Sequence, residues 1–315
     1  MTTFSEEHKS ENEKLLARSA FKEKLDSISS STVNVSTMRE ILETGPEREF
    51  VIHKNGVFLN MVGTRTKYFW DVNDPRTAIT CLAAFGVYEE VESRILRRIA
   101  SESSVIVDIG ANVGYYTVEL GKLLRKGGTL LSFEPVRETY LRLEENVGLN
   151  ELGSIVKLFD LGLSNTDHQA TIFLPEESGS SAASLRNLHP DEKVGSQEIK
   201  VTTLDKIFEV AQINECSLIK IDVEGGELQV IQGALNTIKK FKPIIFAELL
   251  RKWSAAFSYT PNDVLDLLEK LDYLCFGVSD EIRRVSRFQD SDIETNYIFI
   301  HKDKMHLNED WLNLA

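Results

Sequence analysis

Acidic residues stand at the ends of four runs of apolar residues, each of which predicts a buried β-strand. They are Asp108, Glu134, Asp222 and Glu248, which end or follow the runs at 105–107, 129–133, 218–221 and 243–247. A carboxylate can bind a cationic group, accept hydrogen bonds from hydroxyls, or take a proton as a general base. Because the carboxyl ends of parallel strands meet at one edge of a sheet, four such acids predict a single ligand site.

A turn with two glycines follows the first of these strands. It reads Gly110-Ala111-Asn112-Val113-Gly114 and opens a segment that is predicted as helix down to Lys126. A strand, a tight turn and a helix in succession place a helix N-terminus over a small ligand. The glycines would let the backbone approach that ligand without a Cβ clash.

The residue types in this turn favour one ligand over another. A dinucleotide-binding turn needs Gly-x-Gly-x-x-Gly, but Asn112 and Tyr115 stand at its second and third glycine positions. Asp108 would also repel a pyrophosphate, whereas the sulfonium and ammonium of S-adenosylmethionine tolerate a carboxylate well. The spacing Asp108-x-Gly110-x-Asn112-x-Gly114 is therefore typical of S-adenosylmethionine sites, and a nicotinamide-dependent oxidoreductase is disfavoured.

The next two predicted strands supply further candidate contacts to such a ligand. Glu134, followed by Pro135, is placed to accept both ribose hydroxyls in a bidentate contact. After the strand predicted over 154–159, the residues Asp160, Leu161 and Gly162 lie where an adenine edge would be reached.

Charged residues alternate within and after the apolar run at 218–221. By the two-residue period of a strand, Lys220, Asp222 and Glu224 share one face. Charges in a central parallel strand are costly unless they are paired or functional. A structural Lys220–Asp222 ion pair and a catalytic role for these residues therefore both remain open.

A larger architecture must bring these residues together. Predicted strands and helices alternate from Val105 to Val278, which indicates an α/β fold with a doubly wound, mostly parallel sheet. Helices are predicted over 88–100, 136–146, 204–211, 227–238 and 261–271, and strands over 199–202, 273–278 and 296–301. Residues 175–197 are small and polar and are predicted as a long loop that covers a site or stays mobile.

The first 70 residues have a different pattern. Residues 4–28 predict an amphipathic helix, which is a candidate dimer contact. Two short apolar runs flank Asn55-Gly56, a strong hairpin signal, and residues 66–70 predict another strand.

Composition excludes several classes of protein. The 315 residues are 42% hydrophobic and carry a net charge of −13, which argues against nucleic acid and anionic membranes as partners. Three widely spaced cysteines indicate a reducing compartment without disulfides or a zinc knuckle. The polar N-terminus does not read as a signal peptide and no apolar run reaches the length of a membrane span, so we expect a cytoplasmic protein.

Taken together, these segments resemble the FkbM family of methyltransferases. The matching pieces are Asp108–Thr117, Phe133-Glu134-Pro135, Asn146 with Asn150, Ser184-Leu185, Thr203-Leu204-Asp205, Ile219–Gly225 with Glu227, Gly233-Ala234, 243–248 and Gly86-Val87-Tyr88-Glu89. The resemblance implies a class I methyltransferase (Rossmann-like) fold with an antiparallel last strand. It also implies S-adenosylmethionine as methyl donor and O-methylation of a sugar, polysaccharide precursor or polyketide-like metabolite.

The expected domains are an N-terminal helix and β-hairpin appendage (1–65), the methyltransferase domain (66–301) and a C-terminal tail (302–315). Expected cofactor contacts are Glu89, Asp108, Gly110, Asn112, Gly114, Tyr115, Tyr116, Thr117, Glu134, Pro135, Asp160, Leu161 and Gly162.

The expected catalytic residues are Asp222, Lys220, Glu224 and Glu248. Asp222 is the best candidate for the residue beside the methyl group, with Lys220 holding it ionised. A hydroxyl acceptor needs either a general base or a divalent cation such as Mg²⁺, and these carboxylates suit both. The remaining alternatives are an N-methyltransferase and a non-catalytic scaffold. Four aromatic residues, Phe69, Trp70, Trp253 and Tyr259, are interpreted as core residues rather than as a surface for a sugar.

Overall fold

The structure is a computed structural model that describes residues 42–43, 45–74, 76–176, 179–279, 282–289 and 294–307. The predicted helix over 4–28 lies outside the described residues, and so does the tail beyond residue 307. The chain divides into two compact units, Met1–Tyr88 and Glu89–Ala315, which are described separately below. The domain limits expected at 65/66 and 301/302 stay predictions.

The first unit contains a three-stranded antiparallel sheet. Strands β1 (Arg48–His53), β2 (Gly56–Met61) and β3 (Thr66–Trp70) pair in sequence order. His53 pairs with Gly56, so the turn of the predicted hairpin is at residues 54–55. Helix α3 (Ala78–Phe85) follows, and the Trp70 indole donates a hydrogen bond to Thr80 on it at 3.1 Å. The hairpin and the third strand are therefore confirmed.

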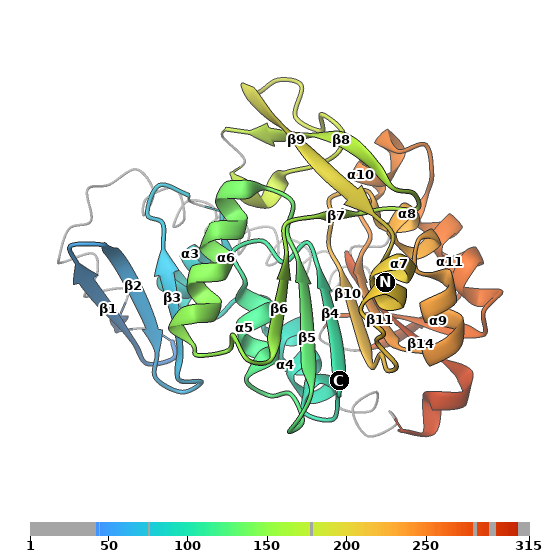
Figure 1. Cartoon of the computed structure of the whole chain (residues 1–315), viewed down its shortest axis with the longest axis horizontal. Helices are drawn as coiled ribbons and strands as arrows, with labels where there is room; N and C mark the ends of the chain where they lie inside the picture. The colour runs from blue at the N-terminus through green and yellow to red at the C-terminus, as the bar shows by residue number, and fades with distance from the viewer. Residues whose placement is uncertain are drawn as a thin grey trace, which may run out of the picture. The chain divides into compact units, whose positions relative to one another are not determined.

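The second unit is built on an eight-stranded sheet with the order β13-β12-β14-β11-β10-β4-β5-β6. Its strands are β4 (Val105–Ile109), β5 (Thr129–Phe133), β6 (Val156–Phe159), β10 (Leu218–Ile221), β11 (Ile244–Glu248), β12 (Tyr273–Gly277), β13 (Arg283–Val285) and β14 (Asn296–His301). Strands β11, β10, β4, β5 and β6 are parallel neighbours, and the antiparallel β14 lies between β11 and β12 (Figure 1). The predicted doubly wound sheet with an antiparallel last strand is confirmed.

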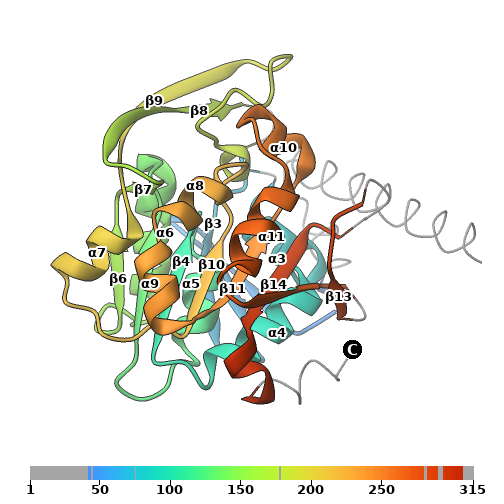
Figure 2. The same ribbon diagram turned by 90° about the vertical axis from the view of Figure 1, so that its right-hand side faces the viewer.

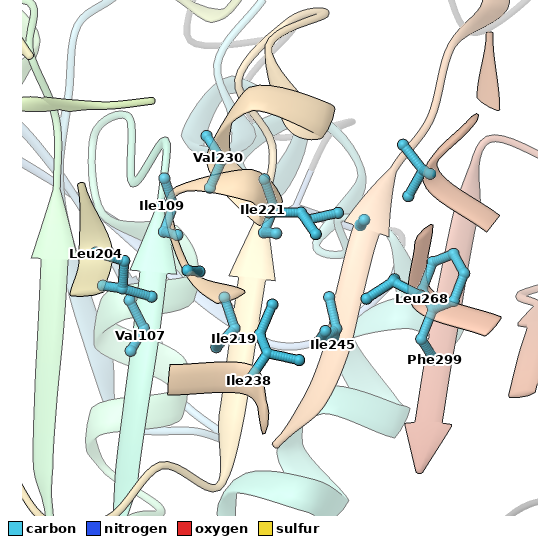
Figure 3. Packing of buried hydrophobic residues seen from close by; sticks show 14 of the residues in the cluster. Val107, Ile109, Leu204, Ile219, Ile221, Val230, Ile238, Ile245, Leu268 and Phe299 are labelled. Carbon is cyan, nitrogen blue, oxygen red and sulfur yellow. The ribbon is translucent and has the colours of Figure 1, made fainter. Parts of the chain in front are cut away.

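Helices cover both faces of this sheet. The α-helices described in this unit are α4 (Glu90–Ala100), α5 (Tyr115–Gly121), α6 (Arg137–Leu149), α7 (Leu204–Val210), α8 (Glu227–Gln232), α9 (Leu235–Phe241), α10 (Arg251–Ala256) and α11 (Pro261–Glu269), of which α10 lies at the end of the sheet. Figure 3 shows the larger core, in which strand residues such as Val107, Ile219 and Ile245 pack with Ile238 of α9 and Leu268 of α11. Because side chains alternate along a strand, the intervening Asp108 and Lys220 are left to the opposite face.

Two helix predictions differ from the structure. The helix predicted over 227–238 is two helices, α8 and α9, separated at Gly233-Ala234. A Cβ on Gly233 would fall 2.0 Å from the carbonyl oxygen of Ser164. The absence of a side chain at Gly233 therefore lets the chain between α8 and α9 pack against the backbone of Ser164. Helix α5 ends at Gly121 rather than Lys126, because the following residues turn toward β5.

The predicted loop over 175–197 is wrong in extent. Strands β8 (His168–Pro175) and β9 (Val194–Thr202) pair antiparallel over their whole length, and β7 (Gly162–Leu163) adds to β9. The small and polar residues gave no strand signal for this hairpin. It is stabilised by the backbone hydrogen bonds between its two strands and by a small hydrophobic cluster around Ile172 and Ile199. In both views β8, β9 and α10 lie at the end of the large sheet where β10 gives way to α8 (Figures 1 and 2).

Within the described part of the chain, no helix combines the length and the apolar character that crossing a bilayer requires.

Candidate functional site

A buried ion pair bridges the two central strands of the large sheet. The register of β4 and β10 sets Asp108 opposite Lys220. Lys220 Nζ lies 3.1 Å from Asp222 Oδ2 and 3.8 Å from Asp108 Oδ1. Asp108 is fully buried; its Oδ2 accepts a hydrogen bond from Thr117 at 2.7 Å, while its Oδ1 has no hydrogen-bond partner. The Lys220–Asp222 ion pair, one of the two interpretations that the sequence left open, is therefore present, and Asp108 joins it.

The electrostatic balance keeps this lysine charged. Burial by itself lowers the pKa of Lys220, but the charges of Asp222, Asp108 and Glu89 outweigh it, so the pKa ends above the ordinary lysine value. Burial raises the pKa of Asp108 against the lowering effect of Lys220 and Thr117. The ammonium also lies 5.0 Å above the ring centre of Tyr116.

The strand that carries Lys220 does not extend to Glu224. Strand β10 ends at Ile221, and Glu224 stands in the next turn with a φ of 53°. The shared strand face predicted for Lys220, Asp222 and Glu224 is therefore wrong for Glu224, since the two-residue period stops where the strand stops. The turn nevertheless brings carboxylate oxygens of Asp222, Glu224 and Glu248 within 4.8 Å of one another.

Three buried residues hold this turn in place. Ser184 donates a hydrogen bond from its hydroxyl to the carbonyl oxygen of Glu224 at 2.7 Å. Glu227 accepts from the backbone N–H of Gly225 at 2.9 Å and from the Tyr259 hydroxyl at 2.8 Å. The left-handed backbone at Glu224 costs on the order of 1 kcal/mol or more, and these hydrogen bonds stabilise it.

Burial and the repulsion between neighbouring carboxylates act on Glu224 in the turn and on Glu248 at the end of β11. Burial, and then the charges of Asp222, Glu224 and Glu89, raise the pKa of Glu248 well above the ordinary value. Burial likewise raises the pKa of Glu224 well above its usual range.

Glu89 lies at the same edge of the sheet, before the first turn of α4, and is partly buried. The Tyr116 hydroxyl donates a hydrogen bond to Glu89 Oε2 at 2.5 Å. Burial, opposed by this hydrogen bond and by Lys220 and reinforced by Asp222, raises the pKa of Glu89 to about 7. Glu89 and Tyr116 therefore extend the acidic cluster from α4 and α5.

The glycine turn is packed against the residue that follows β10. Gly110 has a φ of 76°, and a Cβ on it would fall 1.7 Å from the carbonyl oxygen of Asp222. Gly114 has a φ of 89° and precedes α5. Asn112, with a φ of 50°, donates its backbone N–H to Glu134 Oε2 at 2.9 Å. The turn therefore contacts Asp222 through Gly110 and Glu134 through Asn112.

Glu134 is buried at the end of β5 with both oxygens in backbone hydrogen bonds. Its Oε1 accepts from the N–H of Val136 at 2.9 Å, in addition to the bond from Asn112. Burial, opposed by these two bonds, raises the pKa of Glu134 to about 7. Each oxygen of a carboxylate has two lone-pair sites, so one on each remains for a further donor. Pro135 follows and accepts a hydrogen bond from the Gln197 amide at 3.0 Å.

The other predicted cofactor contacts differ in their surroundings. The Tyr115 hydroxyl lies 2.9 Å from Ser93 of α4 and accepts from Arg97, so its side chain faces α4. Thr117 is fully buried between Asp108 and Ser132. Asp160 is exposed and pairs with Arg137 at 3.2 Å. Leu161 is partly buried, and Gly162 is part of β7.

Sequence reasoning gave no role to Ser184, Glu227 and Tyr259 in the site. Tyr259 is buried as predicted, but its hydroxyl also donates a hydrogen bond to Glu227. Ser184 and Glu227 belonged to the segments of the family resemblance, and that was the one signal that pointed to them. Their partners lie in other elements, so no local pattern marks them.

The arrangement can do two kinds of chemistry. The site contains seven carboxyl groups, those of Glu89, Asp108, Glu134, Asp222, Glu224, Glu227 and Glu248. In the described ion pairs one cation, Lys220, contacts members of this set, namely Asp108 and Asp222. Such a set can bind a cationic ligand and take up a proton. The three oxygens within 4.8 Å also have the ligand type that Mg²⁺ prefers.

Comparison with known proteins gives a family match over more than half of the chain. The model described as "Methyltransferase FkbM domain" matches residues 108–275. Among curated proteins, hexuronic acid methyltransferase AglP of Haloferax volcanii is 27% identical over 197 residues, which cover 62% of this chain and 72% of that protein. Methyltransferase 1 of Beauveria bassiana is 29% identical over 148 residues, which cover 42% of this chain and 59% of that one.

Solved structures include methyltransferase FkbM from Methylobacillus flagellatus, with a TM-score of 0.41, 15% identity, and coverage of 85% of this chain and 59% of that one. The chain therefore spans about three fifths of that structure and of the fungal relative.

Proposed function

Because this chain belongs to the FkbM methyltransferase family, we propose that it methylates a hydroxyl group of a sugar, a polysaccharide precursor or a polyketide-like natural product. The enzyme is an S-adenosylmethionine-dependent methyltransferase with a class I methyltransferase fold. The observation that carries the proposal is the gathering of carboxyl groups at the carboxyl ends of β4, β5, β10 and β11.

The residues present fit S-adenosylmethionine, which when bound supplies a methyl group on a positively charged sulfur. The buried Oδ1 of Asp108 lacks a hydrogen-bond partner, and carboxyl groups outnumber the cations paired with them. A dianionic pyrophosphate would be repelled by this set, whereas a sulfonium and an ammonium are attracted.

In this proposal Glu134 binds the ribose. Its carboxylate is fixed by two backbone N–H groups at 2.9 Å, and its remaining lone pairs suit two adjacent hydroxyls. Gly110, Asn112, Gly114 and Pro135 shape the backbone around it. Contacts of Asp160, Leu161 and Gly162 with the adenine stay a prediction.

The catalytic proposal places Asp222 beside the methyl group. Lys220 holds the Asp222 carboxylate by a hydrogen bond of 3.1 Å and so fixes its orientation. Methyl transfer requires the acceptor oxygen, the methyl carbon and the sulfur to be in line, so a fixed carboxylate that receives the hydroxyl hydrogen helps to align the acceptor. Glu224 and Glu248 lie close enough to receive the proton.

The acceptor class rests on the family and on the relatives. AglP is named as a hexuronic acid methyltransferase, which makes a sugar hydroxyl the first acceptor to try. An aliphatic hydroxyl is a poor nucleophile at neutral pH, and the cluster around Asp222 supplies the base that it needs. Trials with paired hydroxyl and amine acceptors would separate O-methylation from N-methylation.

The donor assignment is tested by calorimetry with S-adenosylmethionine. We expect Glu134→Gln to weaken binding by about 10- to 100-fold, because charge-assisted hydrogen bonds contribute roughly 1.5–3 kcal/mol. The control Glu198→Gln removes an exposed carboxylate on β9 and should leave the affinity unchanged. If wild-type protein gives no binding, or if Glu134→Gln binds as tightly as wild type, the assignment fails.

The acceptor is then sought by following S-adenosylhomocysteine formation with candidate sugars. We expect Asp222→Asn to bind the donor and to lose about 100-fold or more in turnover, as removal of a positioned base does. Full activity in Asp222→Asn would remove it from the mechanism. Activity that disappears with a chelator and returns with Mg²⁺ would favour a cation over a carboxylate base.

A further inference from the structure

Ser184 is fixed by backbone hydrogen bonds to strand β8. The N–H of Phe173 donates to the carbonyl oxygen of Ser184 at 2.8 Å, and the N–H of Ser184 donates to the carbonyl oxygen of Phe173 at 3.2 Å. Because both backbone groups of Phe173 are used in this antiparallel bridge, Ser184 lies along the edge of β8 opposite to β9. Ser184 is 1% exposed, and its hydroxyl donates to the carbonyl oxygen of Glu224 at 2.7 Å.

Two side chains hold the two ends of one peptide group in the turn after β10. The carbonyl oxygen of Glu224 and the N–H of Gly225 belong to the same planar peptide unit. Ser184 donates to this oxygen, and Glu227 accepts from this N–H at 2.9 Å. A peptide plane held at both ends resists rotation, and the side chain of Glu224 leaves the backbone directly before it. The bond from Ser184 therefore helps to set where the Glu224 carboxyl group lies within the carboxyl cluster.

Gln197 makes the corresponding contact from strand β9. Its side-chain amide donates to the carbonyl oxygen of Pro135 at 3.0 Å and accepts from the backbone N–H of Arg137 at 3.2 Å. Between these two residues lies Val136, which packs in the hydrophobic cluster of the hairpin. The N–H of Val136 is one of the two that fix the Glu134 carboxylate. The hairpin therefore holds the backbone that orients the proposed ribose-binding residue.

A section of regular β-ladder joins these two contacts. Gln197 lies opposite Ile172 in the register of β8 and β9, and the next residue of β8 is Phe173, which makes the bridge to Ser184. The two positions are therefore separated by two strand spacings, about 10 Å. The β8–β9 pairing extends over the whole of β8, at the end of the large sheet (Figures 1 and 2). Strands paired in this way transmit a displacement better than an irregular loop does.

We propose that the β8–β9 hairpin couples the methyl-donor site to the catalytic turn, with Gln197 and Ser184 as positioning residues. Gln197 fixes the segment that orients Glu134, and Ser184 fixes the peptide group that orients Glu224. A donor that orders the first segment therefore orders the turn through the hairpin, and by reciprocity a turn held by Ser184 favours the donor. The inference rests on the proposed function, in which Glu134 binds the ribose and Glu224 receives the acceptor proton.

Hydrogen exchange in the turn tests the contact of Ser184 without an acceptor. The amides of Val223 and Gly225 donate to Glu227, so they exchange when the turn opens. In the ligand-free protein Ser184→Ala should speed their exchange about 3- to 10-fold, because one hydrogen bond to the turn is lost. Ser184→Thr keeps the hydroxyl and should restore the rate.

The matched control for this variant is Ser196→Ala. Ser196 is exposed and lies opposite Phe173 on β9, so it has the same neighbour as Ser184 on the other edge of β8. Its replacement should leave exchange in the turn unchanged. With an acceptor found as described above, Ser184→Ala should also lower kcat about tenfold at saturating donor, and Ser184→Thr should recover it.

Gln197→Leu tests the other end of the hairpin. The described hydrogen bonds of the Gln197 side chain go to Pro135 and Arg137, so its effect on the turn must pass through the hairpin. In wild type, saturating S-adenosylhomocysteine should slow the exchange of Gly225, and in Gln197→Leu this slowing should be lost although the ligand is bound. The control Glu198→Gln, at the exposed neighbouring residue, should retain it. This variant keeps the test decisive if Ser184→Ala does not fold.

Affinities for S-adenosylhomocysteine from calorimetry complete the test. Ser184→Ala and Gln197→Leu should each weaken binding about 3- to 10-fold. If one hairpin transmits both effects, the double variant should bind about as well as the weaker of the single variants. Single effects that multiply in the double variant would show two independent local contacts and would overturn the proposal.

Three other outcomes would also overturn it: wild-type exchange in Ser184→Ala, an equal effect of Ser196→Ala, and ligand-induced slowing that persists in Gln197→Leu. Absence of any ligand binding by wild type would refute the proposed function and this inference with it. Binding without a response of the turn would refute the inference alone.

Discussion

Replacing Lys220 by methionine removes the positive charge that lies between Asp108 and Asp222. Lys220 is 3% exposed and Asp108 is fully buried, so neither charge can be resolvated when its partner is lost. Breaking a buried ion pair from one side costs about 3–5 kcal/mol. We therefore expect Lys220→Met to lower the free energy of unfolding of the second unit by about that amount.

The matched control is Lys206→Met. Lys206 also pairs with an aspartate, Asp167, but both side chains are about half exposed. Exposed ion pairs contribute about 0–1 kcal/mol, so this variant should be near wild type. The comparison separates the loss of a buried counter-charge from the loss of a lysine.

The loss of stability in Lys220→Met should also depend on pH in a defined direction. With Lys220 gone, the pKa of Asp108 in the folded protein rises further above its unfolded value, so the folded state binds more protons than the unfolded state. Stability then falls as pH rises between the two pKa values, by at most about 1.4 kcal/mol per pH unit for one group. The deficit of Lys220→Met should therefore be larger at pH 8 than at pH 5.

Urea unfolding followed by circular dichroism and tryptophan fluorescence measures these differences, provided that the two signals coincide. Adding Asp108→Asn to Lys220→Met should restore most of the lost free energy of unfolding, because the buried carboxylate without a counter-charge is removed. The reasoning is refuted if Lys220→Met unfolds within about 0.5 kcal/mol of wild type at pH 8, or if the double variant recovers nothing.

Three further predictions concern the turn, its support and pH. Gly110→Ala should abolish donor binding, because its Cβ would fall 1.7 Å from a backbone carbonyl oxygen; Gly127→Ala, also at positive φ but in open space, should cost only about 1 kcal/mol in thermal unfolding. Tyr259→Phe should lower the free energy of unfolding by about 1–3 kcal/mol, because the Tyr259 hydroxyl donates a hydrogen bond to a buried carboxylate. The loss should exceed that of Tyr273→Phe, whose hydroxyl donates to a neutral carbonyl oxygen. Since the pKa of Glu134 is raised to about 7, the ligand-free protein should lose stability as pH rises from about 4.5 to 7, and Glu134→Gln should reduce that slope in denaturant titrations.

The local patterns of the sequence determined the elements that surround the site. The apolar runs before Asp108 and Glu134, the glycines after Asp108, and the alternation of strands and helices depend on residues close in the chain. The Asn55-Gly56 hairpin was predictable for the same reason. These features led to an α/β sheet with acids along one edge, and the order of its strands agrees.

Packing between distant segments decided the rest. The fully buried pairing of Asp108 with Lys220 follows from the register of β4 and β10, which are more than 100 residues apart in the chain. Ser184 reaches Glu224 only because the β8–β9 hairpin folds over the end of the sheet. Whether Glu248 is charged depends on the carboxyl groups that other strands bring to it. A residue's type is set locally, but its burial and its partners are set by contacts across the fold, and these fix its protonation.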